Sequence, residues 1–325
     1  MTTESTTSRE ITVELFESLY ESCSNWGRWG TDDQRGTLNY ITPEVIQKAA
    51  SLVRSGKAVS LQLPIDADGP QTGNLGRVNP IHQMTATGTD HVNGAQIFEG
   101  DSLGFGFADD SIFMFLQGGT QWDALGHVFR NGKMYNGFSA SEVTAQGAKR
   151  GGVENMPTVV SRGVLLDLPA VKGKSHLSPG EAITPEDLDE ACTFHNVTIE
   201  PGDVVLIRTG DMAARRDLPQ WDGYSGGDAP GLSLRTASWF HEKKVAAIAT
   251  DTWGAEVRPN ELEASFQPLH LILIVSMGLL VGEIWELDSL AAECAADGRY
   301  EFLFVGPPLV IPGAVGAPLN PQAIK

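Results

Sequence analysis

Three short apolar segments separated by helical patterns constrain the fold of this chain more than any other feature. Residues 162–169 (RGVLLDLP), 201–210 (PGDVVLIRTG) and 245–251 (VAAIATD) have the length and the Val, Leu and Ile content of strands. Helices are predicted between them, at 184–196, which opens with a Thr-Pro start signal, and at 235–244. Strands that alternate with helices pair into a sheet that the helices cover. We therefore predict an α/β protein with a mixed-sheet core flanked by helices.

The rest of the chain supplies further elements around this region. Helices are predicted at 10–26, 42–56 and 287–298, and strands at 57–65, 111–117 and 300–311, of which 111–117 is expected to be buried. Residues 66–110 are rich in glycine and irregular, which is more typical of a functional loop region than of a linker. No change of composition marks a boundary. We therefore expect one domain over residues 1–325, with an N-terminal helical extension up to about residue 56.

The chain is acidic, with 41 Asp and Glu residues against 23 Lys and Arg residues and a formal net charge of -18. A negative surface repels phosphate backbones, so we expect a small-molecule substrate and no nucleic-acid partner. The three cysteines are far apart in the sequence, which argues against a disulfide framework or a cysteine-based zinc site. The first residues lack the apolar core of a signal peptide, and the longest apolar run is too short to cross a bilayer. These features favour a cytoplasmic protein with no membrane partner.

Four polar side chains stand in step in residues 117–127, QGGTQWDALGH. In an extended chain Gln121 and Asp123 point to the same face, and Gln117 and His127 join them if the intervening glycines bend the chain. A carboxylate and an imidazole on one face can bind a cation, or act as a base and its orienting partner. Polar side chains at a strand end can equally satisfy loop backbone, so the spacing alone leaves both interpretations open.

Further candidate residues follow later segments of the chain. Asp251 and Trp253 come at the carboxyl end of the strand predicted at 245–251, where open α/β sheets bind ligands. An aspartate in that position can also cap the next turn. His270 and Glu283 stand before and after a long apolar run and can reach one centre, although a lone histidine is more often structural.

Three more residues are candidates for substrate contacts. His82 and His91 lie in the irregular region 66–110, and Trp122 lies inside the polar motif, where a large apolar side chain suits an apolar substrate. The sequence contains no P-loop, HExxH or GxSxG motif. This absence disfavours nucleotide-binding, zincin and serine-hydrolase functions.

Residues 117–127 resemble the signature of the cyclase family, which contains bacterial kynurenine formamidase and isatin hydrolase. The signature is His-x-Gly-Thr-His-x-Asp-x-Pro-x-His, and the chain matches it at Gly119, Thr120, Asp123 and His127. Gln117 and Gln121 stand where the family has two metal-binding histidines, and Leu125 stands where it has proline. The resemblance extends from about residue 25 to the last residues of the sequence.

The resemblance implies a fold of the swivelling β/β/α type and a homodimer or larger assembly. It also implies a divalent metal, often manganese or zinc, and hydrolysis of an amide, formamide or cyclic amide. By position, Asp123 would be a metal ligand and His127 the general acid and base. His270 and Glu283 match the family's later His and Glu pair. The leading hypothesis is therefore a hydrolase that acts on a C–N bond or a lactone-like carbonyl.

The two glutamines change what this site can bind. A neutral carboxamide oxygen is a weaker ligand than imidazole, so zinc and manganese are expected to bind weakly. Gln117 and Gln121 with Asp123 and Glu283 would suit an oxygen-rich site for magnesium. If the metal is absent, Asp123 and His127 can work as a metal-free acid–base pair. Two alternatives thus stand beside the hydrolase: a metal-free cyclase or dehydratase of secondary metabolism, and a non-catalytic small-molecule binding protein.

Overall fold

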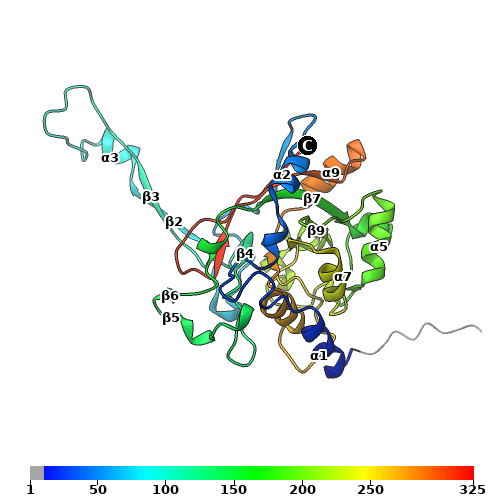
Figure 1. The fold of residues 1–325 in the computed structure, drawn as a ribbon. Helices are drawn as coiled ribbons and strands as arrows, with labels where there is room; N and C mark the ends of the chain where they lie inside the picture. Colours follow the sequence, from blue (N-terminus) through cyan, green and yellow to red (C-terminus); the bar gives the residue numbers. More distant parts are fainter. Residues whose placement is uncertain (1–10) are drawn as a thin grey trace, which may run out of the picture.

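A computed structural model describes residues 11–325, and its core is a mixed sheet of nine strands (Figure 1). In spatial order the strands are β1, β15, β13, β7, β9, β11, β12, β4 and β14. Their bounds are β1 Ala58–Ser60, β4 Gln121–Asp123, β7 Val160–Asp167, β9 Val204–Arg208, β11 Ala247–Thr250, β12 Leu280–Glu283, β13 Glu301–Val305, β14 Gly316–Pro318 and β15 Gln322–Ile324.

Parallel strands lie at the centre of this sheet and antiparallel strands at its sides. β7, β9, β11 and β12 run parallel to one another. On the β7 side, β13, β15 and β1 are each antiparallel to the strand before them. On the other side, β4 is antiparallel to β12 and to β14. The prediction of an α/β protein with a mixed-sheet core is confirmed, and the three predicted strands that support it become β7, β9 and β11.

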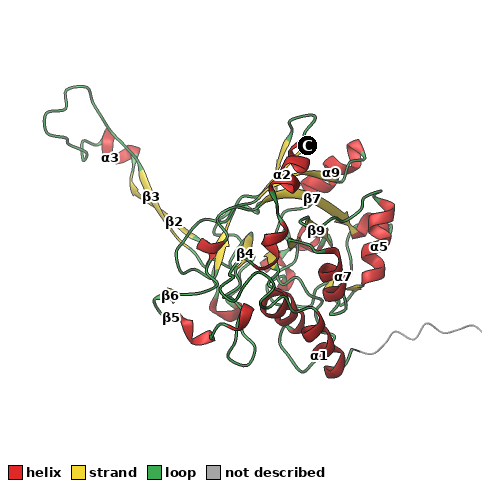
Figure 2. Ribbon diagram, viewed as in Figure 1, coloured by secondary structure: helices red, strands yellow, loops and turns green. Residues whose placement is uncertain are grey.

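Helices flank the sheet (Figure 2). The longer ones are α1 Val13–Ser22, α2 Pro43–Ala50, α5 Pro185–Phe194, α7 Thr236–Lys243 and α9 Asp288–Asp297. The short ones are α3 Gly88–Val92, α4 Leu168–Val171, α6 Asp211–Arg215 and α8 Pro268–His270, which continues into the π-helix η7 Leu271–Met277. Turns of 3-10 helix are η1 Gly36–Tyr40, η2 Asn74–Gly76, η3 Tyr135–Gly137, η4 Ala140–Glu142, η5 Val153–Asn155 and η6 Pro219–Gly223. Within residues 11–325, none of these helices has the length and apolar character needed to cross a membrane.

Threonines begin three of the longer helices. The side chains of Thr12, Thr42 and Thr184 each accept a hydrogen bond from a backbone N–H in the first turn, of α1, α2 and α5 respectively. Proline follows the threonine in α2 and α5, where its missing N–H loses no helical hydrogen bond. The Thr-Pro pattern therefore located these two helix starts from the sequence.

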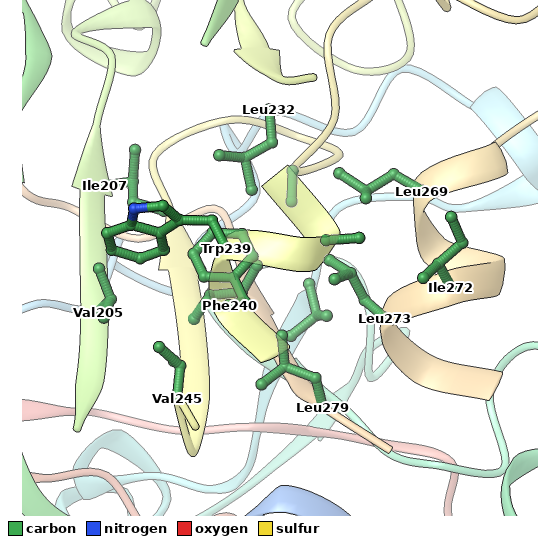
Figure 3. Packing of buried hydrophobic residues seen from close by; sticks show 14 of the residues in the cluster. Val205, Ile207, Leu232, Trp239, Phe240, Val245, Leu269, Ile272, Leu273 and Leu279 are labelled. Atoms are coloured by element: carbon green, nitrogen blue, oxygen red, sulfur yellow. The ribbon is translucent and has the colours of Figure 1, made fainter. Parts of the chain in front are cut away.

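Alternate residues of the central strands enter two hydrophobic clusters, one on each face of the sheet. Val205 and Ile207 of β9 pack in one cluster with Trp239 of α7 (Figure 3). Leu206, which lies between them in the strand, packs in the other cluster with Trp122 of β4. A strand that is buried on both faces has no polar alternation, which is why the segments 201–210 and 245–251 are almost continuously apolar.

Residues 81–113 form an arm that projects from the body of the molecule (Figure 1). Its stem is a two-stranded sheet in which β2 Ile81–Ala86 pairs antiparallel with β3 Asp109–Phe113. Every residue of β3 is exposed, so the prediction of a buried strand at 111–117 is wrong. The apolar run SIFMFL has the composition of a buried strand, and composition does not show whether apolar side chains face a core or a solvent-exposed arm. Two smaller sheets pair β5 Val143–Thr144 with β6 Gly147–Ala148 and β8 Ala182–Ile183 with β10 Gly231–Leu232.

Candidate active site

The candidate site lies where β4 pairs with the end of β12. β4 places Gln121 and Asp123 on one face of the sheet and Trp122 on the other, because side chains alternate along a strand. The antiparallel register puts Glu283 directly opposite Gln121. Opposite residues of a pair project to the same face, so the two side chains meet above the sheet.

Three buried side chains at this point can hold a metal ion. Asp123, His270 and Glu283 each offer one ligand atom, and these atoms lie within 4.8 Å of one another. Asp123 comes from β4, Glu283 from β12, and His270 from α8, so the pairing of two strands and the entry of one helix assemble the group. One imidazole and two carboxylates form a donor set that suits zinc, manganese or magnesium.

Glu256 fixes the orientation of His270. Its carboxylate accepts hydrogen bonds from the backbone N–H groups of Leu269 and His270, and it lies 2.6 Å from His270 Nδ1. This contact directs the other ring nitrogen, Nε2, to Glu283 Oε1 at 3.1 Å. A carboxylate behind the imidazole is the usual support of a metal-binding histidine, because it fixes the tautomer and the ring plane.

His127 lies at the edge of the same group. Its Nε2 is 3.7 Å from Asp123 Oδ1, and its side chain is 24% exposed. A tight turn brings it there: the His127 N–H donates to Ala124 O, and the chain at Gly126 passes so close to Gly151 that a Cβ at Gly151 would lie 2.7 Å from Gly126 N. Burial lowers the pKa of His127 to about 4, with Arg77 adding to the effect. The imidazole is therefore neutral at physiological pH and can accept a proton.

Gln121 connects the two carboxylates of the group. Its Nε2 donates to Glu283 Oε2 at 3.0 Å and to Asp123 Oδ1 at 3.4 Å. The carbonyl oxygen of the same side chain is buried and has no hydrogen-bond partner among the described residues. A buried polar atom without a partner is unfavourable, so the Gln121 amide is satisfied at one end only.

The buried groups shift one another's pKa values. Burial raises the pKa of Asp123 well above its usual range, and the nearby carboxylate of Glu283 raises it further. Burial disfavours the charged form of His270, but hydrogen bonds to Glu256 and Glu283 outweigh this effect and raise its pKa well above the ordinary value. The raised pKa values favour the protonated forms of Asp123 and His270, and binding of a divalent cation would compete with these protons.

A cavity of about 20 Å³ adjoins the group and is nearly closed. Its lining consists of Asp123, His127, His270 and Glu283 together with Leu75, Arg77, Trp253 and Gln267. This volume accommodates one water molecule or ion, but no organic substrate. Leu75 and Arg77 belong to the segment that precedes the arm, so this segment covers the site.

The structure brings together most of the predicted site residues. Asp123, His127, His270 and Glu283 line one cavity, Gln121 is hydrogen-bonded to two of them, and Trp253 lines the same cavity. Gln117 does not join them, because its amide packs over Gly316 of β14, where the missing side chain leaves room for it. The expectation that both glutamines belong to the site holds only for Gln121.

Four other predicted substrate contacts lie elsewhere in the structure. Trp122 is fully buried on the opposite face of β4, where its ring packs on Trp285, because neighbouring residues of a strand face opposite ways. Asp251 is fully buried and accepts hydrogen bonds from Thr209 and Gly210, so its side chain holds the loop after β9 and does not cap the turn that follows β11. His82 and His91 lie on the projecting arm, where His82 pairs with Asp110 of β3.

Three residues of the site escaped the sequence analysis. The sequence hints only weakly at Glu256, which follows Trp253 closely in the loop after β11. It points more clearly to Arg77, because no other Lys or Arg occurs between Lys57 and Arg130. No sequence pattern points to Gln267.

Comparison with known proteins finds a matching family and related structures. A model of the family described as "Putative cyclase" matches residues 34–257. The solved structure of a novel cyclase shares 41% sequence identity with this chain and has a TM-score of 0.87, covering 94% of this chain and 99% of that protein. Isatin hydrolase A from Labrenzia aggregata, bound to benzyl benzoate, shares 20% identity with a TM-score of 0.57, covering 86% of this chain and 97% of its own.

A third solved structure is a predicted metal-dependent hydrolase from Bacillus stearothermophilus. It shares 18% identity and has a TM-score of 0.52, covering 82% of this chain and 97% of its own. At these identities the two hydrolases show a shared fold and no more. No curated protein matches the chain in sequence.

Proposed function

Because the chain belongs to the cyclase family, we propose that it is a hydrolase of an amide, formamide, cyclic amide or lactone carbonyl. One observation carries the proposal: three buried ligand atoms of Asp123, His270 and Glu283 lie within 4.8 Å of one another, with the neutral imidazole of His127 beside them. Such a group can hold a cation and, next to it, move a proton. Both promote the addition of water to a carbonyl carbon.

The residues present fit a divalent cation. Asp123 and Glu283 would supply carboxylate oxygens and His270 would supply Nε2, with Glu256 behind it. The unpartnered Oε1 of Gln121 offers a fourth donor, if the amide turns about its last bond and releases the two carboxylates. When bound, such a cation polarises the carbonyl and lowers the pKa of a water molecule.

The chain's own residues perform the proton transfers. His127 is neutral, so its free nitrogen can take a proton from the attacking water. The same imidazole can then deliver this proton to the leaving nitrogen or oxygen. Leu75 and Arg77 cover the cavity, which limits access of bulk water during the reaction.

A second function is favoured by the hydrogen bonds of Gln121. Its Nε2 already bridges Glu283 and Asp123, which is the place that a cation would occupy between two carboxylates. In that state the two carboxylates share a hydrogen-bond donor without a metal, and Asp123 and His127 form an acid–base pair suited to a metal-free cyclase or dehydratase.

Elemental analysis of the purified protein separates the two functions. We expect the hydrolase to retain a divalent cation in substoichiometric amounts in chelator-free buffer, and to lose activity after chelation. A panel of aryl formamides, cyclic amides and lactones then tests turnover, with cation restored.

His127→Ala provides the matched test of chemistry. We expect turnover to fall about 10²–10⁴-fold, the usual contribution of a general acid–base residue, while the melting temperature stays close to that of the wild type. His176→Ala, at a histidine outside the site, serves as the control. Turnover in His127→Ala equal to that of the control would remove His127 from the mechanism.

A further inference from the structure

We propose that Arg77, Trp253 and Gln267 form an anion-binding subsite that holds the carboxylate released by hydrolysis. The inference rests on the proposed function, because hydrolysis of each of these substrates leaves a carboxylate. Water oxygen adds to the carbonyl carbon and the C–N or C–O bond breaks. One proton of the water goes to the leaving atom, and the other leaves when the new acid ionises.

Arg77 is a cation with unused donors at the mouth of the cavity. Its guanidinium lies over the ring of Trp253, 5.5 Å from the centroid, and one N–H group donates to Gln117 O at 3.3 Å. A guanidinium carries five N–H groups, so four are unpaired within the part of the chain that the structure describes. In the same part of the chain no carboxylate lies within ion-pair distance of Arg77. The stacking on Trp253 thus holds the charge in place and leaves it free to bind an anion.

Trp253 adds a second, independent sign of a ligand. The residue is 3% exposed and lines the cavity, yet its indole N–H has no hydrogen-bond partner among the described residues. An indole N–H only donates, so the missing partner has to be an acceptor such as a carboxylate or carbonyl oxygen. A buried donor left unpaired is unfavourable, and a bound oxygen would relieve this.

Gln267 completes the donor side of the cavity. Its Nε2 lies over Gly254, where a Cβ would come within 3.0 Å of it, so the absence of a side chain at Gly254 admits the amide. The carboxyl groups of Asp123 and Glu283 line the same cavity and disfavour an anion next to them. We therefore expect a bound carboxylate to lie against the donors of Arg77, Trp253 and Gln267.

Residues 72–78 form the segment that covers the cavity and positions Arg77. Thr72 and Val78 form a β-bridge, and Gly73 and Gly76 between them have φ of 96° and 75°, so the segment is a tight turn. The cavity below is too small for a product, so the turn has to move outward when a substrate enters. Arg77 then returns over the substrate as the turn closes.

Binding of benzoate and benzamide to chelator-treated protein tests the subsite without turnover. The two probes have the same ring and similar size, and only benzoate carries a charge. By titration calorimetry we expect the wild type to bind benzoate more tightly than benzamide. Arg77→Gln should lower the affinity for benzoate about 10- to 100-fold and leave the affinity for benzamide nearly unchanged, because charge-assisted hydrogen bonds are stronger than neutral ones.

Three further variants make the test specific. Arg77→Lys keeps the charge and should recover part of the affinity, whereas Trp253→Phe keeps the ring, loses the N–H and should weaken benzoate several-fold. Arg28 also lies over a tryptophan, Trp29, but outside the cavity. Arg28→Gln should therefore leave the affinity for benzoate unchanged. Melting temperatures confirm that each variant is folded.

Two results would overturn the inference: no preference for benzoate in the wild type, including no measurable binding, or benzoate affinity in Arg77→Gln equal to that in Arg28→Gln. The proposed function fails separately. If no amide or lactone is hydrolysed while benzoate still requires Arg77, the subsite stands and the hydrolase does not. If hydrolysis occurs but benzoate binding does not depend on Arg77, the hydrolase stands and the subsite does not.

Discussion

At the scale of single residues, Gln121 decides between a metal site and a metal-free network. Its amide N–H groups stabilise the two carboxylates of Glu283 and Asp123, while its oxygen has no partner. An imidazole in this position would bring a basic nitrogen to the same carboxylates. The glutamine therefore lowers the affinity of the site for zinc or manganese without removing the other ligands.

Gln121→His is expected to raise zinc and manganese affinity by at least about tenfold. The physical reason is that imidazole is a stronger ligand for these ions than a neutral amide. The measurement is a titration of each metal into chelator-treated wild type and variant. Gln117→His is the matched control, because the Gln117 side chain packs over Gly316 and should leave the affinity unchanged. Stoichiometric, chelator-resistant metal in the wild type would show that Gln121 does not weaken the site.

Glu256→Gln is expected to reduce metal affinity about 10- to 100-fold, the usual effect of removing the support of a metal-binding histidine. The carboxylate lies 2.6 Å from His270 Nδ1 and holds the ring from behind. Glu261→Gln changes a neighbouring carboxylate that binds Ser233 and Leu234 instead, so its metal affinity should equal that of the wild type. Equal affinities in the two variants would contradict a supporting role for Glu256.

The location of the site could be predicted from the sequence, but only part of its membership. Asp123 and His127 belong to one short motif, so their proximity follows from the local sequence. His270 and Glu283 flank an apolar run that has to be buried. Trp122 was assigned wrongly because one residue along a strand reverses the face. Arg77 was missed because its role depends on a turn that folds back over the site, which local patterns do not encode.

At the scale of elements, the segment 26–37 is hydrogen-bonded to the end of the π-helix. Thr37 N–H donates to Gly278 O at 2.9 Å, and Trp26 Nε1 donates to Val275 O at 2.7 Å. Gly36 has φ of 56°, and a Cβ at this position would lie 2.0 Å from Gly278 O. Since His270 stands immediately before the π-helix, this contact helps to fix the helix that carries a site residue.

Gly36→Ala is therefore expected to destabilise the protein by about 2–5 kcal/mol, the sum of an overpacking term and the strain of a positive φ. Gly27→Ala is the matched control: Gly27 also has a positive φ, but nothing lies within 4 Å of its Cβ position. We expect it to cost only about 1–2 kcal/mol. The measurement is the free energy of unfolding in urea. Equal losses would mean that η1 does not pack on Gly278 as described.

The central strands of the sheet could be predicted from the sequence, and the arm could not. β9 and β11 are almost continuously apolar, and α5, the helix between β7 and β9, begins with Thr-Pro, so local patterns and the packed fold agree. β3 leads into the apolar run at 111–116 (SIFMFL), but it pairs with β2 in a hairpin outside the core. Its burial depends on what covers the arm, and this information is not local to the strand.

At the scale of the whole molecule, the arm leaves a set of large apolar side chains exposed. These are Ile81, Met84, Val92, Ile97, Phe98, Leu103, Phe105, Phe107, Ile112 and Phe113. A two-stranded hairpin is marginally stable by itself, and contiguous exposed apolar surface marks an interaction site. Every copy of the chain carries the same arm. Mutual exchange between two copies would bury both arms at once, as in an isologous dimer.

The charge of the chain limits how such an assembly can form. The segment 81–113 contains acidic residues and no Lys or Arg, and the whole chain has a formal net charge of -18. Electrostatic repulsion therefore opposes association of two copies, and apolar contact has to outweigh it. Because added salt screens this repulsion, we expect the assembly to persist or tighten as ionic strength rises.

Sedimentation of the wild type at micromolar concentration should consequently give a dimer or larger species. The double change Leu103→Asp and Phe105→Asp at the exposed end of the arm should shift it toward monomer, because each substitution places a charge in the apolar contact. Leu218→Asp changes an exposed apolar residue on the body and should leave the assembly intact. A wild type that sediments as a monomer, or an arm variant that sediments like the Leu218→Asp control, would show that the arm does not bind a second copy. The candidate site lies apart from the substituted positions, so metal affinity should be the same in monomer and assembly. A loss of metal affinity on dissociation would mean that the contact between copies also supports the metal-binding group.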